Sequence, residues 1–271
     1  MTNHQAETAV RPAPSNPSPA KTWLRALELT APIARRPDRT LPTVIEELAE
    51  TFADAPALLS DRECLTHRAL AERSTRYARW AIEQGLAKGD AVCLLMPNRP
   101  EYMAIWLGIT RVGGIVALLN TNLAGPSLAH CINIAEARHL IVAVELVDRV
   151  AAVRQHLAGA PKIWVHGAGR HQFPRIDDDI ERYPGDRLSM LSILRSAGHR
   201  PATIDDRALY IYTSGTTGLP KAANVSHARV MQWSHWFAGL MDVRSSDRIY
   251  NCLPMYHSVG GVLATDRKSV V

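Results

Sequence analysis

Short apolar runs alternate with longer amphipathic segments through the middle of the chain. Four apolar runs have the length and composition of buried strands, at residues 91–96, 115–119, 139–144 and 162–165. Three segments with helical periodicity or capping signals lie between or after them, at residues 98–113, 126–137 and 145–157. Alternation at this spacing is typical of strands joined by crossover helices. The pattern therefore predicts an α/β fold in which a largely parallel sheet is flanked by helices.

Several residues are candidates for helix ends. One helix is expected to begin near Pro42, and the next to run from Thr66 as its N-cap to Gly85 as its C′ residue. Asn98 is followed three residues later by Glu101, a capping-box pattern that predicts the start of the helix at residues 98–113.

The two flanks of this alternating region have a different character. Residues 1–22 are rich in Pro, Ser and Ala and are predicted to form a disordered leader. The polar, Asp-rich residues 166–185 are expected to be a loop, with a helix near residues 188–196. Further strands are predicted at residues 208–212, 222–225 and 249–253, and a helix is predicted at residues 226–240. We therefore expect two α/β parts, residues 23–200 and 201–265.

Composition narrows the class of protein. The 271-residue chain carries a net charge of +5, but its Lys and Arg residues are scattered, which argues against a nucleic-acid partner. The four cysteines lack paired spacing and indicate reduced thiols rather than a disulfide framework or a zinc site. The longest apolar stretch, residues 104–119, is interrupted by Arg111 and two glycines, which argues against a membrane span. These features predict a cytoplasmic protein and leave peripheral membrane contact open.

The most informative segment is Thr213-Ser214-Gly215-Thr216-Thr217-Gly218-Leu219-Pro220-Lys221. Its glycines allow positive φ and let backbone N–H groups gather around an anion, while the hydroxyls and the lysine add donors and positive charge. The spacing differs from the Walker A loop, in which four residues separate the glycines and Lys follows the second glycine directly. The segment therefore predicts a polyphosphate site of another kind.

This segment resembles the nucleotide loop of the adenylate-forming (AMP-binding) superfamily. Three more segments resemble its fatty acid transport protein and very-long-chain acyl-CoA synthetase branch, at residues 98–108, 117–131 and 252–258. The resemblance covers roughly residues 40–264 and implies the incomplete N-terminal domain of such an enzyme. It implies an acid–thiol ligase in which a fatty carboxylate attacks ATP to give an acyl adenylate, after which coenzyme A displaces AMP.

The resemblance also implies roles for individual residues. Thr217 and Lys221 are expected to be catalytic, because the departing β- and γ-phosphates need hydroxyl, lysine and Mg²⁺ partners. The residues expected to bind the ATP phosphates are Thr213, Ser214, Gly215, Thr216, Thr217, Gly218 and Lys221. Tyr256 and His257 are expected to border the substrate pocket, although a structural role for His257 is equally open. No residue is assigned as a metal ligand.

Two features of the carboxyl-terminal end limit this interpretation. The adenine-binding segments and the small C-terminal domain of the family are expected beyond Val271, and residues 266–271 depart from the family and are interpreted as a non-native tail. The 271-residue chain is therefore expected to be inactive by itself. Two alternatives stay open, a ligase for a smaller acid (a carnitine-like or aryl carboxylate) and a non-catalytic fragment that binds acyl chains or a partner.

Overall fold

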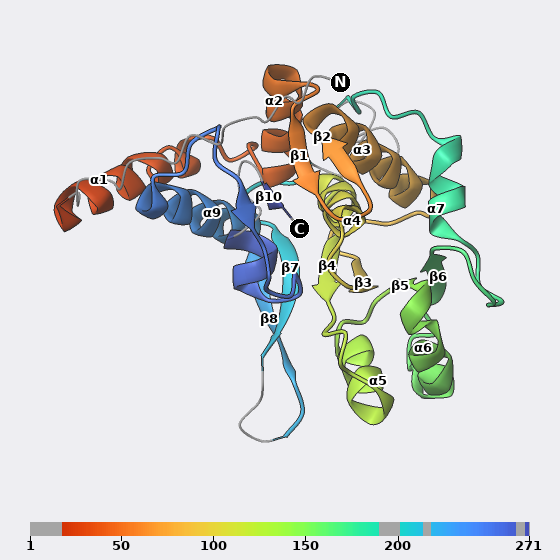
Figure 1. The fold of residues 1–271 in the computed structure, drawn as a ribbon. Helices are drawn as coiled ribbons and strands as arrows, with labels where there is room; N and C mark the ends of the chain where they lie inside the picture. Colours follow the sequence, from red (N-terminus) through yellow and green to blue (C-terminus); the bar gives the residue numbers. More distant parts are fainter. Residues whose placement is uncertain (1–17, 190–200, 214–217, 264–268, 271) are drawn as a thin grey trace, which may run out of the picture.

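The computed structural model describes residues 18–189, 201–213, 218–263 and 269–270. Six strands in this part of the chain form one sheet in the order β6-β5-β3-β4-β7-β8 (Figure 1). Their bounds are β3 (Ala91–Leu95), β4 (Ile115–Leu118), β5 (His139–Ala143), β6 (Lys162–His166), β7 (Arg207–Thr213) and β8 (Lys221–Ser226). Neighbouring strands pair in parallel from β6 to β7, and β8 pairs antiparallel with β7. The predicted α/β fold with a largely parallel sheet is confirmed.

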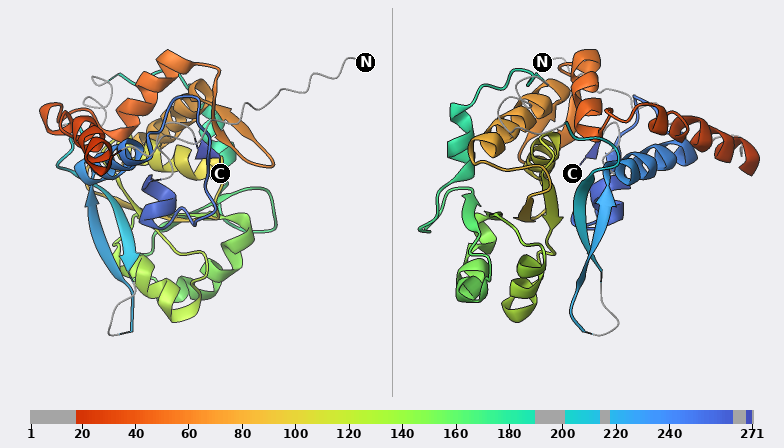
Figure 2. Two further views of the ribbon diagram at one scale, coloured as in Figure 1. Left: turned by 60° about the vertical axis from the view of Figure 1, so that its left-hand side comes forward. Right: turned by 180° about the vertical axis from the view of Figure 1, so that it is seen from behind.

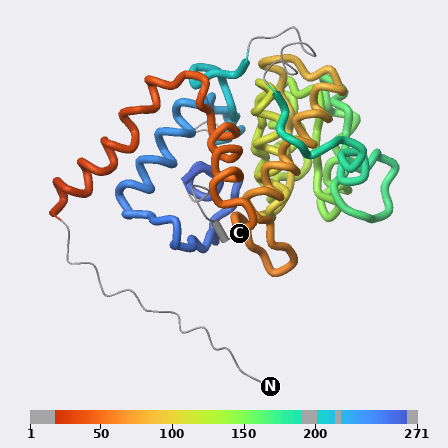
Figure 3. The backbone as a smooth tube through the Cα atoms, turned by 90° about the horizontal axis from the view of Figure 1, so that it is seen from above, coloured from red at the N-terminus to blue at the C-terminus, as the bar shows by residue number. Residues whose placement is uncertain are grey.

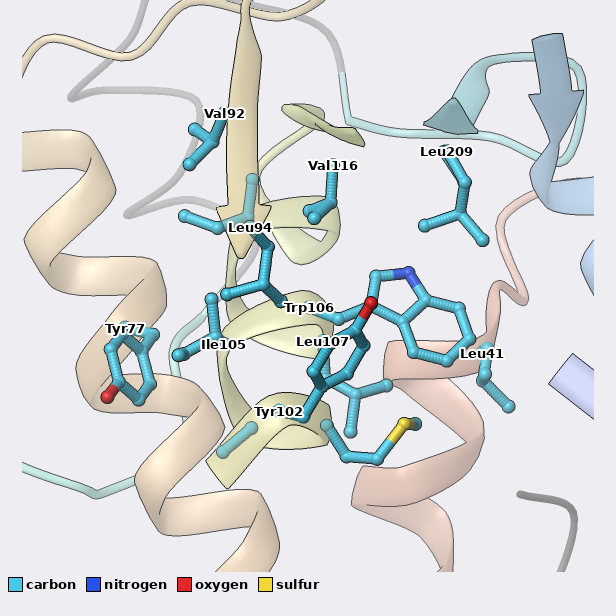
Figure 4. Packing of buried hydrophobic residues seen from close by; sticks show 14 of the residues in the cluster. Leu41, Tyr77, Val92, Leu94, Tyr102, Ile105, Trp106, Leu107, Val116 and Leu209 are labelled. Carbon is cyan, nitrogen blue, oxygen red and sulfur yellow. The ribbon is translucent and has the colours of Figure 1, made fainter. Parts of the chain in front are cut away.

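Helices cover both faces of this sheet. The first face carries α3 (His67–Glu83) and α4 (Pro100–Arg111), and the second carries α5 (Gly125–Ile134) and α6 (Val147–Val153). Alternate residues of β3 point to opposite faces, as strand geometry requires. Leu94 packs with Trp106 of α4, whereas Cys93 belongs to the cluster that contains Leu128 of α5. Figure 4 shows part of the first cluster between the sheet, α3 and α4.

Helix α4 is the central helix of the core cluster on the first face of the sheet, because every residue from Pro100 to Thr110 is buried. At Gly108, an added Cβ would lie 2.5 Å from both the carbonyl oxygen of Ser74 and the Cβ of Tyr77. Only glycine lets α3 and α4 approach this closely. The apolar stretch at 104–119 is thus a core helix followed by a core strand. In the described part of the chain, no helix has both the length and the apolar character needed to cross a membrane.

A second, smaller sheet has the order β2-β1-β10-β9. Its strands are β1 (Pro56–Leu59), β2 (Cys64–Thr66), β9 (Ile249–Tyr250) and β10 (Ser269–Val270). Helix α2 (Leu41–Phe52) precedes β1. The expected strand at 249–253 is shortened to β9, and two residues of the interpreted tail contribute β10 between β1 and β9.

Helices α1 (Pro19–Thr30) and α9 (His227–Met241) lie side by side, as the view from above shows (Figure 3). The contact is close because Gly239 has no side chain, and a Cβ there would lie 2.5 Å from the Cα of Ala26. Arg25 fastens the pair by donating to the carbonyl of Gly239 at 2.7 Å and pairing with Asp242 at 2.6 Å. Helix α1 begins four residues before the expected start of order at Trp23, because Ser18 caps it and Pro19 occupies its first position.

The remaining elements are short. They are η1 (Ile33–Arg35), η2 (Val144–Leu146), η3 (Arg154–His156), α7 (Ile176–Asp179), η4 (Ile180–Arg182) and the π-helical turn η5 (Val259–Leu263). The expected loop at 166–185 therefore contains two helical turns. Most of the expected helix near 188–196 lies outside the described residues. Strand β7, beyond the expected boundary near residue 200, pairs with β4, so both expected parts of the chain share one sheet.

The capping predictions had mixed outcomes. Thr66 caps α3 by accepting from the amide of Ala69, and Gly85 follows the helix with φ of +69°, as predicted. The capping box at Asn98 is wrong, because Arg99 is the N-cap of α4 and no side chain caps that end. Asn98 instead bonds to a segment distant in sequence, and Glu101 bonds to α3. Long-range contacts thus use both polar groups that the local pattern assigned to the cap.

Two buried histidines predict a pH-dependent stability. Burial lowers the pKa of His139 and of His227 from 6.5 to about 4. Unfolding therefore takes up protons between these values, so the stability is complete above about pH 6.5 and falls as the pH drops towards about 4. Urea unfolding at several pH values should show a loss of about 1.4 kcal/mol per pH unit for each histidine.

A single substitution separates the two contributions. His227→Gln should reduce the slope of stability against pH by about half, since one of the two sites is removed. Asp206 and Glu47, whose pKa values are lowered from ordinary carboxyl values, act only at lower pH. A free energy of unfolding that stays constant from pH 7 to pH 5 would contradict the prediction.

Candidate functional site

The predicted polyphosphate segment connects β7 to β8 in an antiparallel hairpin that projects from the edge of the sheet (Figure 1; Figure 2). We call residues 213–221 the hairpin turn. Its two ends face each other, because Thr213 and Lys221 are paired in register and the Thr213 hydroxyl lies 3.5 Å from the Lys221 carbonyl. Ser214, Gly215, Thr216 and Thr217 lie outside the described residues. The structure thus brings together the first and last residues of the predicted site.

The described residues of the hairpin turn have the properties that an anion site needs. Gly218 has φ of +113°, and a Cβ there would meet no atom of the described residues within 4 Å, so backbone conformation favours glycine. Thr213 and Lys221 are exposed, and within the described ranges no carboxylate forms a salt bridge with Lys221. A hydroxyl, a positive charge and a left-handed glycine are therefore available to an incoming anion.

The hairpin turn lies at the carboxyl ends of the parallel strands. Thr213 ends β7, and the residues that follow β3 and β4 reach the same edge because these strands run parallel to β7 through the sheet. In open α/β sheets, ligands bind in the crevice outside this edge. The position of the hairpin turn therefore agrees with the position expected of a ligand site.

Asn98, just beyond β3, brings the segment at residues 252–258 to this edge. Its side-chain amide donates to the carbonyl of Leu253 at 2.8 Å and accepts from the amide of Met255 at 2.8 Å. These two bonds span more than 150 residues of sequence. They fix the segment that carries Tyr256 and His257 beside the start of α4. Sequence reasoning missed this role of Asn98 because a local capping pattern offered a competing assignment.

Tyr256 and His257 point to different surroundings. Tyr256 is 7 % exposed and belongs to the main core cluster, whereas His257 is exposed and its ring centroid lies 4.6 Å from that of Tyr256. Burial, with a contribution from Tyr256, strongly raises the pKa of the neighbouring Tyr102. Of the two predicted pocket residues, His257 is thus the one accessible to a ligand in this structure.

Gly260 and Gly261 let the chain fold back tightly after His257. A Cβ at Gly261 would lie 2.1 Å from the carbonyl oxygen of Met255, and the Gly261 amide donates to the His257 carbonyl at 2.7 Å. Asn251 adds a bond from its side chain to the carbonyl of Gly260 at 2.8 Å. Both glycines lie in the π-helical turn η5, a local geometry that is frequent at functional sites. Glycine at 261 therefore fixes the backbone on which His257 is carried.

Comparison with known proteins shows the family of the chain. A sequence model of the family described as AMP-binding enzyme matches residues 45–265. Long-chain fatty acid transport protein 1 of Rattus norvegicus is 34 % identical over 84 % of this chain and 35 % of its own length. A medium/long-chain fatty-acid–CoA ligase of Mycobacterium tuberculosis is 31 % identical over 81 % of this chain and 34 % of its own length. The chain thus spans about a third of the length of these relatives.

Solved structures show the same fold. An anthranilate CoA ligase bound to anthranoyl-AMP superposes with a TM-score of 0.77 at 22 % identity, over 86 % of this chain and 45 % of that protein. A long-chain-fatty-acid–CoA ligase of Archaeoglobus fulgidus superposes with a TM-score of 0.73, also at 22 % identity, over 86 % of this chain and 47 % of that protein. At this identity the likeness concerns the arrangement of the backbone.

Proposed function

The chain belongs to the AMP-binding enzyme family, and on that premise we propose that the full-length protein is an ATP-dependent fatty acyl-CoA synthetase. In this reaction a fatty carboxylate attacks the α-phosphate of ATP, pyrophosphate leaves, and the thiol of coenzyme A then displaces AMP from the acyl adenylate. The observation that carries the proposal is the accessible Thr213–Lys221 pair at the carboxyl end of β7. The fatty acid as substrate is supported by the names of the curated relatives.

The hairpin turn supplies the groups that the first step needs. Negative charge grows on the departing β- and γ-phosphates, and preorganised donors stabilise such charge most effectively. We assign Lys221 and Thr217 to this stabilisation. The phosphates are cradled by Thr213, Ser214, Gly215, Thr216 and Gly218. Mg²⁺ bound together with the nucleotide would neutralise part of the phosphate charge, and such a site takes few protein ligands. Within the described ranges, no group of three or more His, Cys, Asp or Glu side chains is placed to hold a metal by itself.

We assign the fatty acid to the neighbourhood of Tyr256 and His257. His257 is exposed beside Tyr256, and both are fixed by Asn98 through the backbone of Leu253 and Met255. A histidine there can donate to a carboxylate and hold it for attack. In this proposal, residues 23–200 form the first α/β part of the domain, and residues 201–265 form the beginning of the second. We place the protein in the cytoplasm, and peripheral contact with membranes stays an open alternative.

Acid-dependent release of pyrophosphate tests the proposal. The full-length protein should release pyrophosphate from ATP with long-chain fatty acids, and the rate should fall as the chain is shortened. Coenzyme A should then convert the enzyme-bound adenylate to a thioester. Release with short or aryl acids alone would assign the protein to the alternative ligase class. Absence of release with every acid, in a folded full-length protein, would contradict the proposal and favour a non-catalytic binding role.

A further inference from the structure

Two consecutive residues of α5 contact the two ends of the hairpin turn. Tyr212, directly before Thr213, donates from its hydroxyl to the carbonyl of Cys131, with 2.6 Å between the oxygens. Pro220, directly before Lys221, has its carbonyl oxygen 3.0 Å from Nε2 of His130. One turn of α5 therefore binds the hairpin at two places, directly before Thr213 and directly before Lys221.

The donors and acceptors in these contacts match. The carbonyl of Pro220 only accepts, so Nε2 of His130 carries the proton and donates it. Proline lacks an N–H, so this carbonyl is its only backbone group for hydrogen bonding. The carbonyl of Cys131 lies in the last turn of α5, where backbone carbonyls lack intrahelical partners. Burial strongly raises the pKa of Tyr212, so its hydroxyl keeps the proton that it donates.

The hairpin needs such support because of its place in the sheet. Among the residues that the structure describes, β8 is the edge strand of the six-stranded sheet and pairs only with β7. A two-stranded projection is marginally stable without packing against another element. Helix α5 follows β4, the parallel neighbour of β7, so it is fixed to the sheet independently of the hairpin. Contact with α5 therefore links both ends of the turn to a helix that is fixed to the parallel part of the sheet.

We propose that His130 and Tyr212 are positioning residues that hold the hairpin turn where Thr213 and Lys221 can receive the phosphates of ATP. This inference rests on the proposed function. Neither side chain is proposed to touch the nucleotide, and their effect passes through the backbone at residues 212 and 220. A site held within a fraction of an ångström by its surroundings loses much of its effectiveness when that support is removed.

Hydrogen exchange in the full-length protein tests the contact itself. His130→Ala should speed exchange of backbone amides in residues 218–222 by about 3- to 10-fold, the effect of losing one hydrogen bond. His130→Gln keeps an N–H donor at a similar reach and should restore slow exchange. The matched control is His156→Ala, because His156 lies on η3, is exposed and forms no hydrogen bond with the described residues of the hairpin. Its exchange pattern at 218–222 should equal that of the wild type.

Steady-state kinetics test the functional consequence. His130→Ala and Tyr212→Phe should each raise KM for ATP by about 3- to 10-fold and leave KM for the fatty acid nearly unchanged. His130→Gln should recover most of the ATP affinity. A general loss of folding would instead lower the fraction of active enzyme and would not separate the two KM values.

The outcomes distinguish this inference from the proposed function. Unchanged exchange at 218–222 in His130→Ala would overturn the contact. Faster exchange with an unchanged KM for ATP would overturn its positioning role. If no acid supports pyrophosphate release, the proposed function fails with this role, while the exchange result still decides whether α5 holds the hairpin.

Discussion

Replacing Lys221 by alanine in the full-length protein should slow adenylate formation by about 100-fold or more, the usual cost of removing one preorganised donor to developing negative charge. Thioester formation from preformed acyl adenylate should change far less, because pyrophosphate has already left by then. Lys221 is suited to this role because it is exposed, pairs in register with Thr213 and has no carboxylate partner within the described ranges. Rapid-quench measurement of pyrophosphate release separates the two steps.

Two variants control this experiment. Lys221→Arg keeps the positive charge and should retain more adenylation activity than Lys221→Ala, though Arg and Lys differ in geometry. Lys162→Ala removes a lysine at the opposite edge of the same sheet, where its ammonium lies 4.2 Å from the centroid of the Trp164 ring. That variant should keep the wild-type rate. A Lys221→Ala enzyme with the wild-type adenylation rate would remove Lys221 from the mechanism.

Replacing Glu101 by alanine should lower the free energy of unfolding by about 3 kcal/mol, since it breaks a buried charged network on one side. Glu101 is 5 % exposed and accepts from Arg73 at 2.7 Å and from the hydroxyl of Tyr77. Burial and the adjacent Glu101 carboxylate strongly raise the pKa of Tyr77, so that hydroxyl stays protonated. Without Glu101 it would remain buried with an unmet donor. Urea unfolding followed by the fluorescence of the buried tryptophans measures the change.

Glu63 provides the matched control for this substitution. It also accepts from Arg73, at 2.6 Å, but its side chain is 34 % exposed. Glu63→Ala should therefore cost less than about 1 kcal/mol, as expected for a pair near solvent. Glu101→Gln keeps an acceptor for Tyr77 and should lie between the two. An effect of Glu101→Ala no larger than that of Glu63→Ala would show that the network does not stabilise the fold as argued.

The parallel part of the sheet could be predicted because its strands are buried on both faces. Such strands appear as nearly continuous apolar runs, and runs at 91–96 and 139–144 became β3 and β5. Helix ends could also be predicted where no distant contact competes with the local capping pattern, as for Thr66 at the start of α3 and Gly85 after its end. These elements could be predicted because local propensity and tertiary contacts favour the same structure.

Prediction failed where distant partners decided the structure. The Asn98 pattern satisfied a local capping rule, but its amide pairs with the backbone of Leu253 and Met255, and no feature of residues 98–101 shows this. The contacts of α5 with the hairpin turn were hidden for the same reason, because His130 and Pro220 are 90 residues apart. At the start of α1 a signal was available, since Ser18 followed by proline is a helix-start pattern that composition obscured.

A crystal structure of the full-length protein with a non-hydrolysable ATP analogue and Mg²⁺ tests the central claim most directly. We expect the triphosphate to lie against the hairpin turn, with Nζ of Lys221 within hydrogen-bonding distance of a phosphate oxygen. A triphosphate bound elsewhere, with Lys221 facing solvent, would contradict the assignment of residues 213–221 as the phosphate site.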